Sequence, residues 1–169
     1  QISRSEQDEY AIQSYQRALE AQQKGFLAEE IVPVDGISED EEPKRASFEK
    51  LPKLKPAFKA GGTITAANAS KINDGASALV LSSASYAREK GLKPLAKVVG
   101  WSTFSQEPAW FTTAPAGAIG SLLKKVGWAV GDVDLFEVNE AFSVVALAVM
   151  KLAGLPKERV NVHGGAVAF

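Results

Sequence analysis

Asn139 stands at a junction where its side chain could polarise a substrate oxygen. Residues 134–138 are predicted to form a strand that leads directly into it, and residues 140–153 form an apolar helix after it. Free N–H groups and the positive dipole end gather at a helix N-terminus, so a polarised oxygen or an ordered water is readily held there. Asn is also a good N-cap, and this second role is compatible with the first.

A second junction, at residues 65–76, is rich in small residues. Asn68, Ser70 and Asn73 offer short polar groups there, and their small neighbours let a ligand approach the backbone closely. A tight turn with an Asn cap is the alternative, and the residues alone favour the turn.

The third junction, at residues 161–165, contains His163, which is the only histidine of the chain. A lone His at a strand end is more often structural than catalytic, and nothing nearby in the sequence supplies a partner. We assign His163 no catalytic role.

A basic segment covers residues 44–59 and follows an acidic stretch at residues 35–43. A solvated loop is the plain interpretation of such a charge run. Clustered Lys and Arg also offer charge-assisted hydrogen bonds to phosphate groups. Composition alone favours the solvated loop for this segment, whose cations are Lys44, Arg45, Lys50, Lys53, Lys55 and Lys59.

The composition excludes several kinds of chemistry. The chain of 169 residues has no Cys, so it holds no disulfide, no thiolate metal site and no thiol nucleophile. A net charge of -1 gives no general attraction to nucleic acid or to anionic membranes. No apolar run approaches the length of a membrane span.

Strands and helices alternate along most of the chain, which predicts a layered α/β fold. Ser3 and Glu6 have capping-box spacing at the start of an amphipathic helix, and Gly25 offers its end. Further helices are expected at residues 83–90, 114–126 and 140–153. Strands are expected at residues 30–34, 63–66, 77–81, 95–101, 134–138 and 160–163.

Five segments in the same order resemble the thiolase family, and together they cover essentially the whole chain. The likeness is greatest to thiolases that use acetyl-CoA. The segments are Ser3-Arg4-Ser5-Glu6-Gln7-Asp8, Glu30-Ile31-Val32-Pro33-Val34, Thr65-Ala66-Ala67-Asn68-Ala69-Ser70 with Asn73-Asp74-Gly75-Ala76, Val138-Asn139-Glu140-Ala141-Phe142, and Asn161-Val162-His163-Gly164-Gly165-Ala166.

The resemblance implies an incomplete αβαβα layered architecture made from parts of three domains. Residues 1–60 would belong to a coenzyme A-binding loop domain, 61–92 to the N-terminal core domain and 93–169 to the C-terminal core domain. We therefore expect an internal to C-terminal fragment of a cytoplasmic homotetramer or homodimer, with no nucleic-acid or membrane partner.

The implied reaction is the condensation of two acetyl-CoA molecules to acetoacetyl-CoA and coenzyme A, or its thiolytic reverse. In this family a Cys carries the acyl group, a His in a Gly-His-Pro motif activates it, and a second Cys moves the substrate proton. The chain contains neither Cys nor that motif. We expect residues 1–169 to be inactive alone.

The resemblance also implies which residues bind and polarise the substrate. Asn139 matches an Asn that positions a water in an oxyanion hole. The matching substrate-binding residues are Tyr15, Arg45, Ser47, Lys50, Ala66, Ser70, Ala141 and Phe142. One branch of the family binds a potassium ion at positions that correspond to Tyr15, Ala66, Ala67 and Ala69, whereas no other cofactor is required.

Lys71 departs from the family pattern, because Gly, Thr or Pro is commoner at its position. Two other hypotheses stay open at this point. One is a non-catalytic thiolase-like protein that binds acyl-CoA or lipid, which would lack the paired Cys and the Gly-His-Pro motif. The other is an oligomerisation segment without a ligand.

Overall fold

The computed structural model describes residues 1–169, and its regular structure is helical. The α-helices are α1 (Arg4–Gln23), α2 (Glu42–Arg45), α3 (Ala84–Glu89), α4 (Ala114–Val126) and α5 (Ser143–Ala153). Four 3₁₀ helices accompany them: η1 (Phe48–Lys53), η2 (Pro108–Thr113), η3 (Val130–Asp132) and η4 (Lys157–Arg159). None of these helices has both the length and the apolar character that a membrane crossing requires.

Helix α1 is the longest helix, and the sequence specifies both of its ends. The Ser3 hydroxyl accepts a hydrogen bond from the Glu6 N–H, and the Glu6 carboxylate accepts one from the Ser3 N–H. This is the expected capping box, which satisfies free donors of the first turn. Gly25 follows the C-terminus with a φ of 69°, a left-handed conformation that glycine adopts without steric cost.

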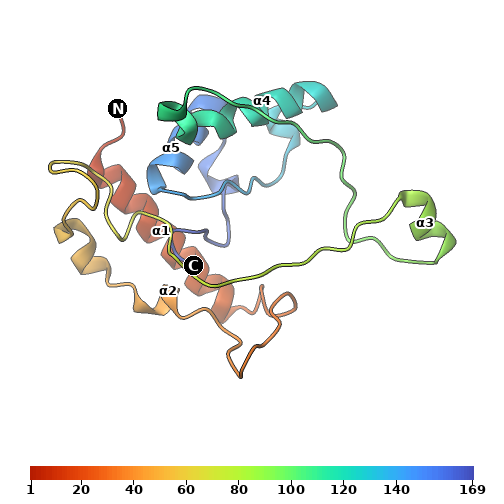
Figure 1. Cartoon of the computed structure of the whole chain (residues 1–169), viewed down its shortest axis with the longest axis horizontal. Helices are drawn as coiled ribbons and strands as arrows, with labels where there is room; N and C mark the ends of the chain where they lie inside the picture. The colour runs from red at the N-terminus through yellow and green to blue at the C-terminus, as the bar shows by residue number, and fades with distance from the viewer.

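Two buried clusters hold the chain together, and both include α1. One cluster gathers around α5, where Val145, Ala146 and Val149 pack with Tyr10 of α1. The other packs Ala11, Tyr15 and Ala18 of α1 against the C-terminal segment. Figure 1 shows this arrangement, with the C-terminus over α1, α5 beside α1, and α4 next to α5 at the top of the view. Helix α1 therefore packs against both α5 and the C-terminal segment.

The expected strands do not form hydrogen-bonded ladders in this chain. Pairing is confined to isolated bridges, of which Phe136 with Val160 is parallel and Val34 with Ile37 is a local turn contact. The strand prediction for 63–66 was wrong, because this segment leads into a turn. A strand is stable only with a neighbour to which its backbone groups can bond, and these segments find none here beyond the single bridges.

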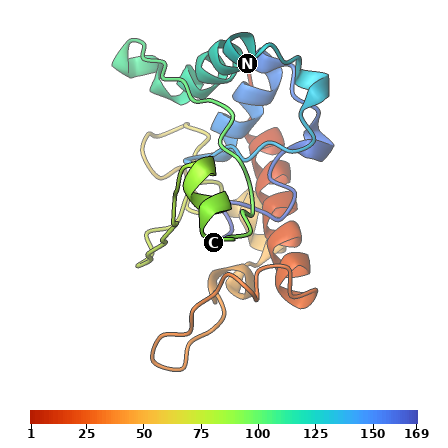
Figure 2. The same cartoon turned by 90° about the vertical axis from the view of Figure 1, so that its right-hand side faces the viewer.

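The most extended part of the chain is residues 71–107, which carry α3 away from the two clusters (Figures 1 and 2). The strand expected at residues 77–81 does not form, so this prediction was wrong. Leu79 and Val80 are 90% and 99% exposed. Other large apolar side chains of this stretch are exposed as well: Ile72, Leu81, Leu92, Leu95, Val98, Val99, Trp101 and Phe104.

Gly164 and Gly165 let the C-terminal segment lie directly against α1 and Glu140. A Cβ on Gly164 would stand 2.7 Å from the Ser14 carbonyl oxygen and 2.8 Å from the Ala18 Cβ. A Cβ on Gly165 would stand 2.6 Å from the Glu140 carboxyl carbon. Real Cβ atoms do not approach so closely, so both positions need glycine.

We expect Gly164→Ala to destabilise the fold by about 2–4 kcal/mol. Overpacking against α1 costs about 1–3 kcal/mol, and the φ of 85° adds about 1 kcal/mol of backbone strain. Denaturant unfolding measures the change. Gly127→Ala is the matched control, because Gly127 has a φ of 74° but no atom within reach of an added Cβ. Equal losses for the two variants would mean that the close approach to α1 contributes nothing.

Candidate functional site

The backbone around Asn139 is held on both sides, while its side chain faces solvent. The Asn161 amide pairs with Val138: its Oδ1 accepts from the Val138 N–H at 2.7 Å, and its Nδ2 donates to the Val138 carbonyl at 2.7 Å. Asn161 adopts a φ of 48°, in the left-handed region where Asn is tolerated better than most residues. On the other side, Glu140 is fully buried, whereas Asn139 is exposed.

Asn139 is not the N-cap of the following helix, so this sequence-based alternative was wrong. Helix α5 begins at Ser143, and Phe142 occupies its N-cap position with an extended backbone. Residues 139–142 form an irregular connection between the Phe136 bridge and α5. The Asn139 amide is therefore free of the capping role and is available to a ligand.

The Glu140 carboxylate accepts four hydrogen bonds and no salt bridge. Oε1 accepts from the Tyr10 hydroxyl at 2.7 Å and from the Asn161 amide at 2.9 Å. Oε2 accepts from the Ser14 hydroxyl at 2.8 Å and from the Val167 N–H at 3.1 Å. An ionised carboxylate has only acceptor sites, and the donor set fits it. Burying such a charge is tolerated when its oxygens are satisfied in this way.

The same environment shifts the pKa of Tyr10. Burial raises the pKa of its hydroxyl above the ordinary range, and the neighbouring Glu140 charge raises it further. A phenol that stays protonated keeps its hydrogen available to the carboxylate. Tyr10 and Ser14 lie four residues apart on α1, which puts both hydroxyls on one helix face. The four-residue spacing of Tyr10 and Ser14 was visible in the sequence, but their shared partner, Glu140, lies more than a hundred residues away.

The second junction lies beside the first, as the resemblance implied. Ala69 and Phe142 form an antiparallel bridge, the Ser70 N–H donates to the Ala141 carbonyl at 3.0 Å, and the Ser143 N–H donates to the Asn68 carbonyl at 2.8 Å. Ser70 is exposed and Phe142 is half-buried against the Phe58 ring. Three of the expected site residues, Ser70, Ala141 and Phe142, are thus brought together next to Asn139.

Asn68 secures this junction to α1. Its Oδ1 accepts from the Thr65 N–H at 2.8 Å, which confirms the turn with an Asn cap. Its Nδ2 donates to the Asp8 carboxylate at 2.9 Å, and the Arg4 guanidinium pairs with the same carboxylate at 2.7 Å. Sequence reasoning did not identify Asp8 as part of the site. The only sequence signal for Asp8 was its place in the family segment of residues 3–8.

Tyr15, Ala66 and Ala69 converge on one point, where the Lys71 ammonium lies. Nζ donates to the Ala66 carbonyl at 3.0 Å and to the Ala69 carbonyl at 3.3 Å, and it stands 5.2 Å from the centre of the Tyr15 ring. Burial raises the pKa of Tyr15 to about 12 and lowers the pKa of Lys71. Ala67 packs within the buried cluster that contains Tyr15, and its N–H donates to the Thr65 hydroxyl at 3.3 Å.

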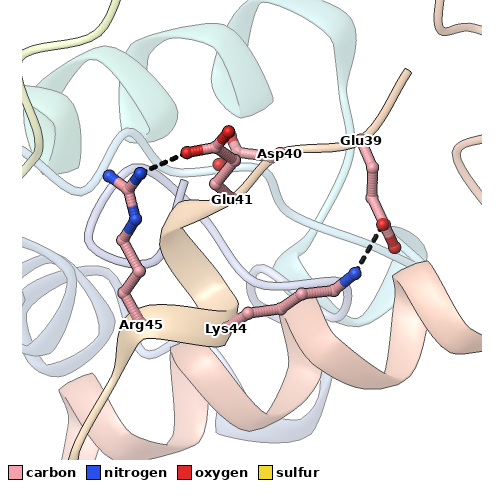
Figure 3. A pocket seen from close by; sticks show the side chains of 5 residues that line it. All are labelled: Glu39, Asp40, Glu41, Lys44 and Arg45. Carbon is pink, nitrogen blue, oxygen red and sulfur yellow. Dashed lines mark hydrogen bonds and ion pairs between the residues drawn. The ribbon is translucent and has the colours of Figure 1, made fainter. Parts of the chain in front are cut away.

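The basic residues are only partly free of carboxylates. The Arg45 guanidinium pairs with Glu41 and with Glu42, and the Lys44 ammonium pairs with Glu39. Figure 3 shows Glu39, Glu41, Lys44 and Arg45, which together with Asp40 line an open hollow of about 280 Å³. Three carboxylates and two cations line the hollow, so its net charge is negative. Ser47 and Lys50 lie just beyond it along the chain, Ser47 before η1 and Lys50, which is exposed, within it.

His163 lies on the surface, with its ring 5.0 Å from that of Phe26. This contact gives the side chain a structural environment, and our prediction that it has no catalytic role is unchanged.

Comparison with known proteins gives the family. Residues 1–85 match the family model of the thiolase N-terminal domain, and residues 92–169 match that of the thiolase C-terminal domain. The chain is 51% identical to an acetyl-CoA acetyltransferase of Schizosaccharomyces pombe, covering 99% of this chain and 45% of the relative. Other similar acetyl-CoA acetyltransferases have names that place them in the cytosol or in the mitochondrion.

Solved thiolase structures follow the same backbone path. The Acat5 thiolase of Ascaris suum in complex with coenzyme A matches with a TM-score of 0.96 and 49% identity, over 98% of this chain and 44% of that one. Human mitochondrial 3-ketoacyl-CoA thiolase in complex with CoA matches with a TM-score of 0.94 and 40% identity, over 99% of this chain and 43% of that one. The chain therefore spans less than half the length of the proteins it matches. The predicted α/β thiolase fold class is confirmed.

We expect Glu140→Gln to destabilise the fold by about 1–3 kcal/mol, because the new NH₂ group must face a donor, and the Val167 N–H has no means of accepting. Denaturant unfolding measures the loss, and Tyr10→Phe combined with Glu140→Gln should cost less than the sum of the single changes. The exposed neighbour Glu137 supplies the control, Glu137→Gln, for which little change is expected. An unchanged free energy of unfolding in Glu140→Gln would mean that the hydrogen bonds to this carboxylate do not stabilise the fold.

Proposed function

Because the chain belongs to the thiolase family, we propose that it supplies the binding and polarising half of an acetyl-CoA acetyltransferase. The complete enzyme would condense two acetyl-CoA molecules to acetoacetyl-CoA and coenzyme A, or catalyse the thiolytic reverse. Support comes from relatives that carry this name and align over 99% of the chain. Two similar solved thiolases are described as complexes with coenzyme A.

The observation that carries the proposal is the meeting of the two junctions. The exposed Asn139 and Ser70 lie on connections that are hydrogen-bonded to each other through Ala141 and Asn68. Both connections are anchored by buried side chains, so the backbone that carries Asn139 and Ser70 is fixed before a substrate arrives. Preorganised donors of this kind stabilise charge that develops on a thioester oxygen.

In this proposal each residue has a limited role. The Asn139 amide holds a water or donates toward the thioester oxygen as negative charge develops on it. Ser70 hydrogen-bonds the pantetheine arm, and Ala141 and Phe142 form its apolar wall. The acyl group is carried by a Cys outside residues 1–169, since the chain contains none. The chain alone therefore has no route to the acyl-enzyme.

The nucleotide end of coenzyme A would meet Arg45, Ser47 and Lys50. The phosphates must compete with Glu41 and Glu42 for the Arg45 guanidinium, because both carboxylates already pair with it. Lys50 is exposed and is free to turn toward a phosphate. We therefore expect Lys50 to make the first contact and Arg45 to exchange partners on binding.

The proposal extends to the domain organisation. Residues 1–60 would form part of the loop domain, 61–92 the returning segment of the N-terminal core and 93–169 the start of the C-terminal core. The exposed apolar stretch around Leu79 and Val80 is then the place where further thiolase strands pack. Assembly as a homotetramer or homodimer and a cytoplasmic location stay predictions. A potassium ion at Tyr15 and Ala66 has a competitor in Lys71.

In the complete enzyme, Asn139→Ala should lower kcat by about 10²–10³ with little change in KM. The lost contact matters mainly to the charged oxygen of the transition state, so turnover suffers more than ground-state binding. Steady-state thiolysis of acetoacetyl-CoA measures both constants.

The control for this variant is Asn73→Ala, which removes an exposed Asn of the junction at residues 65–76. We expect it to keep kcat near the wild-type value. If Asn139→Ala raised KM at constant kcat, Asn139 would be assigned to ground-state binding and the oxyanion role would be lost.

The combined variant Arg45→Ala/Lys50→Ala should weaken coenzyme A binding by about tenfold or more, since each charge-assisted hydrogen bond contributes up to a few kcal/mol and solvent screens exposed ones. Binding of a pantetheine thioester without the nucleotide should not change. Calorimetric titration with both ligands gives the two affinities.

Glu41→Gln provides the complementary test of the same contact. Removing one of the carboxylates that compete for Arg45 should tighten coenzyme A binding. Equal coenzyme A affinities for the wild type and the combined variant would leave the segment as a solvated loop.

A further inference from the structure

The carbonyl groups of Ala66 and Ala69 point toward one place and have no backbone partner there. Neither oxygen accepts a hydrogen bond from a main-chain N–H. Both dipoles present their negative ends to the same small volume. Such an arrangement is unfavourable unless a cation or a donor lies between the oxygens.

Two further groups make this place attractive to a cation. The face of the Tyr15 ring is 5.2 Å from the Lys71 ammonium, within the range of a cation–π interaction. Burial raises the pKa of Tyr15 and lowers that of Lys71, and the Glu42 carboxylate, which acts on both groups, partly offsets the lowering at Lys71. Tyr15 is 4% exposed, so its ring is fixed by packing and the π face cannot turn away.

We propose that the Lys71 ammonium is a tethered monovalent cation, which occupies a site that would otherwise take a free ion of similar size such as potassium or ammonium. An alkylammonium group and these ions share charge and approximate radius, and both bind to carbonyl oxygens. The tether removes the entropic cost of capturing an ion from solution. The folded chain consequently needs no bound metal at this place.

The backbone explains why Lys71 can reach the site. Its N–H donates to the Ala166 carbonyl at 3.2 Å, which fixes the main chain beside the C-terminal segment. The side chain then folds back over the turn that precedes it, and Nζ reaches Ala69 and Ala66. The ammonium thereby links the turn at residues 65–70 to α1, because it contacts the carbonyls of this turn and the Tyr15 ring of α1.

The test compares two replacements in the complete polypeptide that carries residues 1–169. Lys71→Ala removes the ammonium and leaves space, whereas Lys71→Met removes the charge but keeps most of the bulk. Thermal unfolding is recorded at one ionic strength in tetramethylammonium, sodium, potassium or ammonium chloride. Lys90→Ala is the matched control, because the Lys90 ammonium lies 5.8 Å from the Tyr86 ring without carbonyl partners.

We expect Lys71→Ala to lose roughly 3 °C or more of Tm in tetramethylammonium chloride and to regain much of it in potassium or ammonium chloride. Lys71→Met should lose Tm without being rescued by either ion. The wild type and Lys90→Ala should show no preference among the four salts. Because no turnover is measured, the outcome is independent of whether the protein transfers acyl groups.

Three results would overturn the proposal. They are an unchanged Tm in Lys71→Ala, a loss that no monovalent ion reverses, and a wild-type response to potassium as large as that of the variant. If Lys71→Ala does not fold in sodium buffer, its soluble yield on refolding in potassium or ammonium buffer replaces Tm. Recovery there supports the tethered cation, and an equally low yield in every salt refutes it.

Discussion

The buried carboxylate of Glu140 is the interaction on which the rest of the structure depends. It carries a charge that has no cation beside it, so its stability requires that donors from separate parts of the chain stay in place. Tyr10 and Ser14 come from α1, Asn161 from the segment after η4, and Val167 from the C-terminal turn. Satisfying one side chain therefore fixes the relative positions of three segments.

The same requirement shapes the candidate site. The Asn161 amide that donates to Glu140 also pairs with the backbone of Val138, so Asn139 lies between two fixed residues. At the neighbouring junction of residues 65–71 the polar groups are of the opposite kind: carbonyl oxygens converge there, and the Lys71 ammonium donates to them. In both places a local excess of one kind of polar group is balanced by a side chain of the opposite kind, and the backbone that carries Asn139 and Ser70 is fixed as a result.

Helices and turns were predicted well, whereas strands were not. The helix at residues 114–126 has the bounds expected from its pattern and from Gly127. The capping box predicted for Ser3 and Glu6 is present. Residues 77–81 have the composition of a buried strand but lie exposed in an extended conformation. Their composition is suited to a strand inside a sheet, but residues 1–169 provide no neighbouring strand for them.

The sequence by itself determined the helices, the Asn-capped turn, the family and the absence of a thiol nucleophile. A helix closes its hydrogen bonds within four residues, so its information is local. Only the tertiary structure decided that Glu140 is satisfied without a cation, that Asn139 is not a cap, and that Lys71 reaches the carbonyls of Ala66 and Ala69. These outcomes depend on which groups the fold brings within hydrogen-bond distance of one another, and residue spacing along the chain does not specify that.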